Sequence, residues 1–196
     1  MQLGFNYNMT RDQELTFNAD NIVLTHQPDK FVMMAWEMDL MQRHAQIVTH
    51  KGGHVLEIGF GMGISAQFIQ DNKHDTHTIV ESHPAILKRL REWSQDKPTV
   101  RIIQGDWFEM QHEICNNRYD GIFYDADCNN SPKFRDVIVN NALKPHGVFT
   151  YFAPNGTDKY EYGDALKRDV VTIQVSIPKN SYHNDATCYV PYFINS

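Results

Sequence analysis

Residues 55–65 read VLEIGFGMGIS, an apolar segment that runs directly into three glycines spaced two positions apart. The apolar residues predict a buried strand, and the residues after the glycines predict the start of a helix. Glycine has no Cβ, so the backbone can turn sharply and approach a ligand closely, while the helix N-terminus presents free N–H groups. The stretch therefore predicts a nucleotide-binding turn in an α/β fold.

The spacing of the glycines indicates which nucleotide is favoured. The dinucleotide fingerprint G-x-G-x-x-G would place its third glycine at position 64, which is Ile64. Here the third glycine is Gly63, and an acid, Glu57, lies two residues before Gly59. This E-x-G-x-G-x-G pattern resembles motif I of class I methyltransferases, which use S-adenosylmethionine (AdoMet). A glycine-rich turn that binds no ligand is the alternative.

Composition limits the other classes of function. The chain has 196 residues with 41% hydrophobic content, which predicts one globular domain over residues 1–196. No apolar run approaches the ~20 residues of a membrane span, and the N-terminus lacks signal-peptide features, so we expect a cytoplasmic protein without a membrane partner. A net charge of −6 argues against nucleic acid. Three scattered cysteines predict reduced thiols and no metal site.

Strands and helices alternate outward from the glycine turn, as in a Rossmann-like, doubly wound and mostly parallel sheet. A C-terminal antiparallel hairpin is expected from two β-branched and aromatic runs. Residues 1–30 have no clean period and predict an irregular or partly helical segment, either a lid over the sheet edge or a frayed tail. The expected helices are 31–49, 62–70, 85–94, 107–115, 133–143 and 160–168; the expected strands are 54–58, 77–81, 99–104, 119–125, 148–152, 170–177 and 187–194.

Polar side chains close three of these strands. Glu81 ends the second strand, 22 residues after Gly59, where a carboxylate can accept hydrogen bonds from both ribose hydroxyls. Asp106 and Trp107 follow the third strand and could contact an adenine, although a tryptophan there is equally well a core residue. Asp125 ends the fourth strand, and with Asp127 it indicates a cationic acceptor. A capping role for Asp125 is the alternative.

Several segments together resemble one family of class I methyltransferases. Residues 31–147 look like the family that contains guanidinoacetate N-methyltransferase and the fungal and plant type IV protein arginine N-methyltransferases. The segments that carry the likeness are VMMAWEMDLM, GGHVLEIGFGMGIS, ESHPAIL, GDW, YDGIFYD and LKPHGVFTY.

The resemblance implies roles for individual residues. Glu37 corresponds to the acid that binds the guanidino group, and Asp125 corresponds to its partner. Two departures are that Asp127 and Cys128 replace the usual surroundings of Asp125, and that residues 153–158 do not match the loop that holds the guanidinoacetate carboxylate. The implied AdoMet site comprises Met33, Met41, Glu57, Gly59, Phe60, Gly61, Met62, Gly63, Ile64, Glu81, Ser82, Asp106, Trp107 and Asp125.

Electrostatics favours the same chemistry. A guanidinium has a pKa above ~12, and the sulfonium of AdoMet is also positive. At ~4 Å and an effective dielectric constant of about 20, two such charges repel by about 4 kcal/mol, and flanking carboxylates would offset that repulsion. We therefore predict methyl transfer from AdoMet to a guanidino nitrogen of a small molecule, giving S-adenosylhomocysteine without a metal. A peptide arginine, another amine, a non-catalytic AdoMet-binding module and a dehydrogenase remain alternatives, and the sequence leaves the oligomeric state open.

Overall fold

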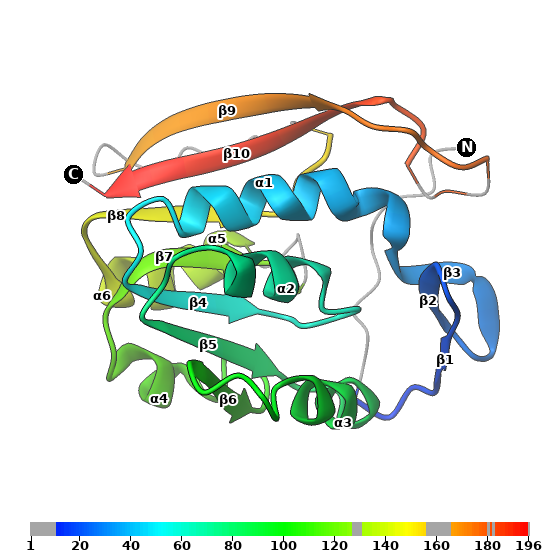
Figure 1. Cartoon of the computed structure of the whole chain (residues 1–196), viewed down its shortest axis with the longest axis horizontal. Helices are drawn as coiled ribbons and strands as arrows, with labels where there is room; N and C mark the ends of the chain where they lie inside the picture. The colour runs from blue at the N-terminus through cyan, green and yellow to red at the C-terminus, as the bar shows by residue number, and fades with distance from the viewer. Residues whose placement is uncertain (1–10, 127–130, 156–165, 180, 182, 196) are drawn as a thin grey trace.

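A seven-stranded sheet with the order β6-β5-β4-β7-β8-β10-β9 forms the centre of the molecule (Figure 1). The computed structural model describes residues 11–126, 131–155, 166–179, 181 and 183–195. The first five strands in this order are parallel, whereas β10 is antiparallel to both β8 and β9, which confirms the predicted fold class. The strands are β4 (His54–Ile58), β5 (Thr76–Glu81), β6 (Val100–Gln104), β7 (Tyr119–Tyr124), β8 (Leu143–Tyr151), β9 (Leu166–Gln174) and β10 (Thr187–Asn195).

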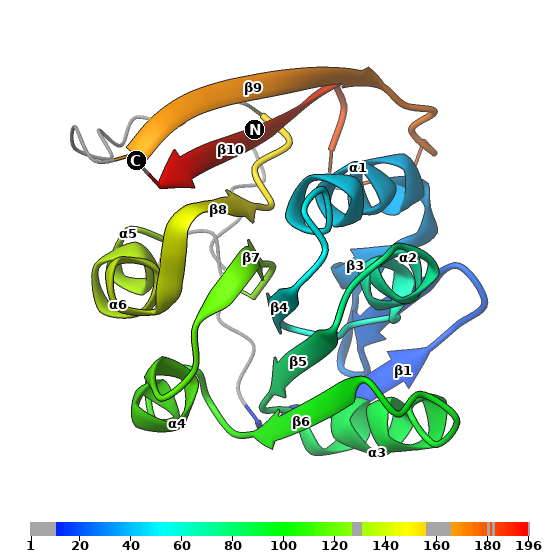
Figure 2. The same cartoon turned by 60° about the vertical axis from the view of Figure 1, so that its left-hand side comes forward.

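Helices cover both faces of this sheet. Figure 2 shows α1, α2 and α3 on one face and α4, α5 and α6 on the other. Among the described residues, no helix is long and apolar enough to cross a bilayer. The helices are α1 (Met38–Val48), α2 (Ile64–Asp71), α3 (Pro84–Trp93), α4 (Gln111–Cys115), α5 (Ser131–Phe134), the π-helical turn η3 (Arg135–Val139) and α6 (Asn140–Ala142).

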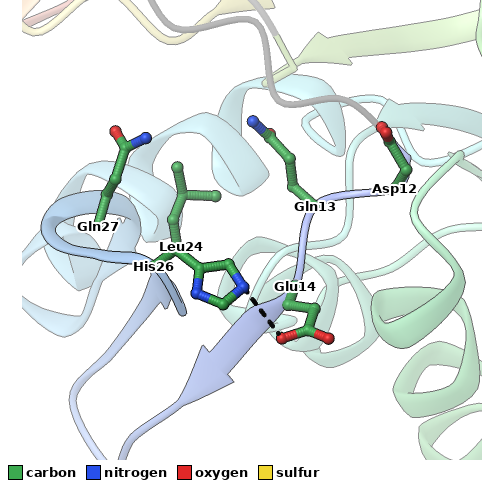
Figure 3. Close-up of a pocket in the computed structure, with 6 residues that line it drawn as sticks. All are labelled: Asp12, Gln13, Glu14, Leu24, His26 and Gln27. Atoms are coloured by element: carbon green, nitrogen blue, oxygen red, sulfur yellow. Dashed lines mark ion pairs between the residues drawn. The ribbon is translucent and has the colours of Figure 1, made fainter.

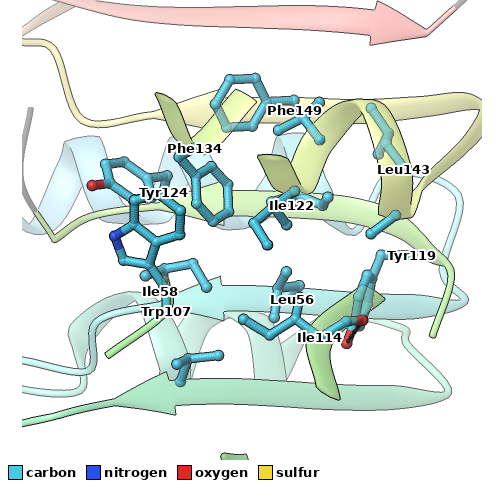
Figure 4. Close-up of a cluster of buried hydrophobic side chains, with 14 of the residues drawn as sticks. Leu56, Ile58, Trp107, Ile114, Tyr119, Ile122, Tyr124, Phe134, Leu143 and Phe149 are labelled. Atoms are coloured by element: carbon cyan, nitrogen blue, oxygen red, sulfur yellow. Dashed lines mark hydrogen bonds between the residues drawn. The ribbon is translucent and has the colours of Figure 1, made fainter. Parts of the chain in front are cut away.

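Alternating side chains of the strands build two separate cores, because successive residues of a strand point to opposite faces. On β4, Leu56 and Ile58 join the aromatic cluster beneath α4 to α6, which Figure 4 shows around Phe134 and Tyr124. Val55 instead joins a cluster on the α1 and α2 face. Glu57 shares that second face and is fully buried, so a carboxylate lies directly beneath the glycine turn.

The N-terminal part differs from the sequence prediction. Strands β1 (Leu15–Phe17), β2 (Asn21–Leu24) and β3 (Gln27–Met34) form a three-stranded antiparallel sheet, so the irregular or helical segment expected there was wrong within the described residues. The helix expected over 31–49 was wrong for 31–34. Met33 and Met34 pair with Ile22 and Asn21 of β2, and this pairing overrides the helical spacing of the apolar residues.

Three smaller differences lie towards the C-terminus. The helix expected over 133–143 is divided by the π-helical turn, and residues 144–147, expected as a turn, form an irregularity inside β8 where His146 has a φ of 61°. Of the helix expected over 160–168, residues 160–165 lie outside the described residues. Residues 166–168 belong to β9, so the helix prediction was wrong there.

A buried histidine fixes α1 to the sheet. The Nδ1 of His44 lies 2.8 Å from the Thr150 hydroxyl oxygen, and that hydroxyl donates to the carbonyl of Pro191 at 2.6 Å. Because the hydroxyl has already given its hydrogen, Nδ1 of His44 is the donor. Burial lowers the pKa of His44 to about 3, so the ring is neutral. The contact joins α1, β8 and β10, and it fixes α1 against the sheet.

Candidate functional site

The glycine turn follows β4 and lies against the carboxyl end of the neighbouring strand β7. Gly59, Gly61 and Gly63 all have positive φ angles, and Gly63 is the N-cap of α2. The N–H of Asp125, directly after β7, donates to the carbonyl of Ile58 at 2.9 Å. A Cβ added at Gly59 would overlap the carbonyl oxygen of Asp125. Only glycine therefore allows the turn and Asp125 to lie against each other.

Two methionines approach the same turn from the N-terminal side. The N–H of Met62 points at the sulfur of Met33 at 3.2 Å, and a Cβ at Gly61 would lie 2.7 Å from that sulfur. Met41 is fully buried in the cluster that contains Met33, and Ile64 packs against this cluster. The structure therefore brings the two predicted methionines to the glycine turn, although they come from β3 and α1.

Glu81 ties the glycine turn to the end of β5. One of its carboxylate oxygens accepts from the N–H of Phe60 at 3.0 Å. The other accepts from the N–H groups of Ser82 and His83 at 2.7 and 2.8 Å. Three backbone donors hold the carboxylate in one orientation, because a buried charge is stable only when it is hydrogen-bonded. Glu81 is therefore a fixed acceptor at the strand end.

Asp106 and Trp107 follow β6 but have different surroundings. Asp106 accepts from the N–H of Phe108 at 2.8 Å and closes a short turn. Trp107 is only 7% exposed and packs edge-to-face on Tyr124 and Phe134, with ring centroids 6.2 and 5.1 Å away. The structure thus places the tryptophan ring in the core, which is the alternative that the sequence left open.

Glu57 lies beneath the turn with both oxygens bonded to protein groups. The hydroxyl of Ser65 donates to one oxygen, and His77 Nε2 is 2.8 Å from the other. Burial and the nearby negative charge of Glu57 raise the pKa of Asp125 to about 7. The partly buried Asp125 carboxyl can therefore take up or release a proton near neutral pH.

Glu37 belongs to a short 3₁₀ turn, η1 (Ala35–Glu37), between β3 and α1. It is 2% exposed, and its Oε1 accepts from the N–H of Met34 at 2.7 Å. Burial, followed by the charges of Asp185 and Glu37, raises the pKa of the Cys188 thiol to about 11. Glu37 is thus close enough to Cys188 of β10 to affect its thiol. Glu37 belongs to the segment that follows Met33 and Met34 of β3, whereas the backbone of Asp125 contacts the glycine turn.

The family model for guanidinoacetate N-methyltransferase matches residues 8–177. This match includes the glycine turn, Glu37 and Asp125. The chain belongs to the guanidinoacetate N-methyltransferase family. It is therefore a member of a family of AdoMet-dependent methyltransferases, and the parallel sheet with its carboxyl-edge turn agrees with that class.

Curated relatives and solved structures are similar to this family member. Protein arginine N-methyltransferase 2 of Candida glabrata is 34% identical over 174 residues, which cover 83% of this chain and 42% of that protein. The Kluyveromyces lactis protein of the same name is 36% identical, with coverage of 78% and 40%. The chain thus spans about two fifths of the length of these relatives. An O-methyltransferase from Bacillus cereus in complex with S-adenosylhomocysteine has the same fold, with a TM-score of 0.65, 14% identity and 81% coverage of each chain.

Sequence reasoning missed one contact beside the site of this family member. His83 caps α3 by accepting from the N–H of Ala85 at 3.3 Å, so its Nε2 is the donor to the carbonyl of Gln13 at 2.7 Å. The cap could have been recognised from a polar residue before Pro84. Its partner could not, because Gln13 is 70 residues away. Asp127 and Cys128 lie outside the described residues.

Two pockets flank the N-terminal sheet of this family member. The first, about 300 Å³, is lined mainly by polar residues. Figure 3 shows His26 and Glu14 on its wall, and this pair is 3.5 Å apart. Both side chains of that pair are largely exposed. The second, about 470 Å³, lies beside Ala35 and Trp36 of η1, the turn whose last residue is Glu37. Its lining is Asp20, Asn21, Met34, Ala35, Trp36, Ser176, Ile177 and Pro178.

Proposed function

We propose that this chain methylates a guanidino nitrogen, with Asp125 as the proton acceptor and Glu37 as the second carboxylate that holds the guanidinium. One observation carries the proposal. The backbone of Asp125 lies against Gly59 of the glycine turn, and its carboxyl has a pKa of about 7. A proton acceptor with such a pKa is well matched to neutral conditions. The contact of its backbone with the glycine turn supports this assignment.

The residues at the carboxyl edge fit AdoMet. Side chains at Gly59, Gly61 and Gly63 would fill the space of the turn, and Glu81 presents a fixed carboxylate one strand away. When bound, AdoMet supplies a methyl group on a sulfonium and leaves as S-adenosylhomocysteine. Asp125 and Glu37 then orient the planar guanidinium by charge-assisted hydrogen bonds. Asp125 would receive the proton that the guanidino nitrogen releases on methylation, while Glu37 would keep hold of the rest of the group.

The class of acceptor is tested with three guanidines. Guanidinoacetate, free arginine and an arginine-containing peptide are incubated with the protein and AdoMet, and the methylated products are measured by mass spectrometry. We expect at least one methylated guanidine. AdoMet binding in a calorimeter without product from any of the three would instead support a non-catalytic AdoMet-binding module.

Arginine within a peptide is the second candidate acceptor beside a small guanidine. The names of the relatives, protein arginine N-methyltransferase 2, favour it, at 34% and 36% identity. The residues after β8 that would hold a small carboxylate also depart from the family pattern at 153–158. A peptide rate well above the rates for the two small molecules would support this candidate.

Glu81 provides a prediction for the cofactor half of the reaction. Replacing Glu81 by Gln is expected to raise the Kd for AdoMet at least about tenfold, because an amide nitrogen would face backbone N–H donors and the ribose would lose a charged acceptor. Titration calorimetry measures the Kd. Glu92→Gln, on the far end of α3, is the matched control and should bind normally. An unchanged affinity in Glu81→Gln would contradict the ribose role.

The N-terminal segment from Arg11 to Phe17, which ends with β1, has the contacts expected of a lid over the cofactor. Arg11 pairs with Glu109 beyond β6 at 2.6 Å, and His83 beyond β5 donates to the carbonyl of Gln13. Phe17 lies under the guanidinium of Arg89 at 4.6 Å. The first two contacts lie beyond the ends of β6 and β5, where the adenosine would lie, and the third fixes the segment to α3. We propose that this segment slows the release of AdoMet.

His83→Asn tests the lid without removing the helix cap, because asparagine is a good N-cap residue but is too short to reach Gln13. The expected result is about a three- to tenfold faster dissociation of AdoMet, measured by stopped-flow fluorescence, since one buried hydrogen bond is lost. His26→Asn, in the turn between β2 and β3 and outside this contact, is the control. Equal dissociation rates in the two variants would contradict the lid.

A further inference from the structure

The second pocket lies where three distant segments of the chain meet. Its walls come from the start of β2, from the end of β3 with η1, and from the segment that follows β9. The walls are held together: the carbonyl of Asp20 accepts from the N–H of Ala35 at 2.7 Å, and the indole of Trp36 stacks on His183 with ring centroids 5.5 Å apart. The pocket is therefore a built feature of the fold, with a volume of about 470 Å³.

This pocket adjoins the carboxylate that we assign to the guanidinium. Trp36 lines the pocket and precedes Glu37, and consecutive Cα atoms are ~3.8 Å apart. Met34 also lines it, and the N–H of Met34 holds the Glu37 carboxylate at 2.7 Å. The Glu37 carboxylate is therefore one hydrogen bond away from a residue of the pocket wall.

The lining combines apolar walls with a carboxylate at the rim. Met34, Trp36, Ile177 and Pro178 present apolar surface, whereas Asp20 is exposed. Lysine and arginine side chains bury their alkyl stems along such surfaces and keep the charged head at a polar rim. The net charge of −6 also favours a cationic ligand over an anionic one.

We propose that this pocket binds a lysine or arginine side chain that flanks the methylated arginine in a peptide acceptor, with Asp20 pairing with its charge. The inference rests on the proposed function and names the acceptor of the same site. An extended peptide advances ~3.3–3.6 Å per residue, so the flanking residue lies about one to three positions from the arginine. The pocket would thus select a basic sequence around the target.

The test compares peptides that carry one target arginine. Each peptide has either lysine or glutamate at one of the three positions on either side of that arginine. Wild-type protein should show a higher kcat/KM for lysine-flanked peptides at one or two of these positions. Asp20→Asn should reduce that preference by about two- to fivefold, as for loss of an exposed ion pair, and Asp20→Lys should abolish or reverse it. Asp29→Asn makes the same charge change on the same sheet outside the pocket, and should retain the wild-type preference.

The outcomes separate the two proposals. If guanidines are methylated but the flanking preference is absent, or is the same in Asp20→Lys, the pocket proposal is overturned while the proposed function stands. If no guanidine is methylated, the proposed function fails, and the pocket is judged by fluorescence anisotropy with labelled lysine-flanked and glutamate-flanked peptides. Tighter binding of the lysine peptide that is lost in Asp20→Lys supports the pocket; equal binding overturns it. Circular dichroism melting verifies that each variant is folded.

Discussion

Replacing Asp125 by Asn is expected to reduce turnover by about 10²- to 10⁴-fold, the range typical for removal of a positioned acid or base, with AdoMet affinity nearly unchanged. The amide keeps the size of the side chain and leaves the backbone contact with the glycine turn intact. It cannot receive the proton that the guanidino nitrogen releases. Single-turnover kinetics and calorimetry measure the two quantities, and near-normal turnover in Asp125→Asn would exclude the proton-acceptor role.

The pH dependence of the same variant provides an independent test. The pKa of Asp125 is raised to about 7, so the acceptor form increases as the pH rises through neutrality. The wild-type rate should therefore rise across about pH 7, whereas the residual rate of Asp125→Asn should not follow that titration. A wild-type rate that is flat between pH 6 and 8 would contradict the assignment.

The free energy of unfolding should fall as the pH rises through neutrality, whereas the rate should increase. A carboxyl whose pKa is raised by folding favours the folded state below its ordinary pKa of 3.8, and this contribution is lost as the pH rises through about 7. At pH 8 the fold therefore holds an ionised carboxylate at a cost, and Asp125→Asn should melt at a higher temperature than the wild type. The difference should narrow as the pH falls towards 4, which differential scanning fluorimetry can follow.

The second large effect, a loss of unfolding free energy, is expected from Glu57→Ala. The variant removes the acceptor of the Ser65 hydroxyl and of His77 in a fully buried position. Breaking a buried pair by deleting one partner typically costs about 3–5 kcal/mol of unfolding free energy, and here the Nε2 of His77 and the Ser65 hydroxyl lose their acceptor. Urea unfolding measures this cost. Glu113→Ala, on the exposed side of α4, is the control and should change little.

A double-mutant cycle and a conservative variant sharpen the Glu57 prediction. Glu57→Ala combined with His77→Ala should cost less than the sum of the two single variants, because the second change removes the orphaned group. Glu57→Gln removes the negative charge that contributes to the raised pKa of Asp125, so the midpoint of the pH–rate profile should move to lower pH. Strict additivity together with an unmoved midpoint would contradict the coupling described for Glu57.

What could be predicted from the sequence depended on how local the determining interactions are. The glycine turn depends on a few adjacent residues, and its backbone conformation follows from the missing side chains. By contrast, Met33 and Met34 are strand residues only because β2 pairs with them, and no local pattern encodes that partner. The resemblance to a family supplied the interpretation of Glu37, which spacing alone did not provide.

The same distinction holds for the candidate site. Glu81 was predicted at a strand end, and its three backbone donors are all within two residues of it or in the glycine turn. The contact of His83 with Gln13 and the stacking of Trp36 on His183 join segments far apart in the sequence. Such contacts are decided by the packing of whole elements, so periodicity and motif spacing carry no signal for them.

The order of strands also has a consequence for how this domain folds during synthesis. β9 leaves the ribosome before β10, yet its partner within the described residues is β10. Until that strand emerges, β9 lacks this partner, and the contact between His183 and Cys188 cannot form. A nascent chain can thus form its glycine turn before β9 and β10 pair, because β4 and α2 precede both strands.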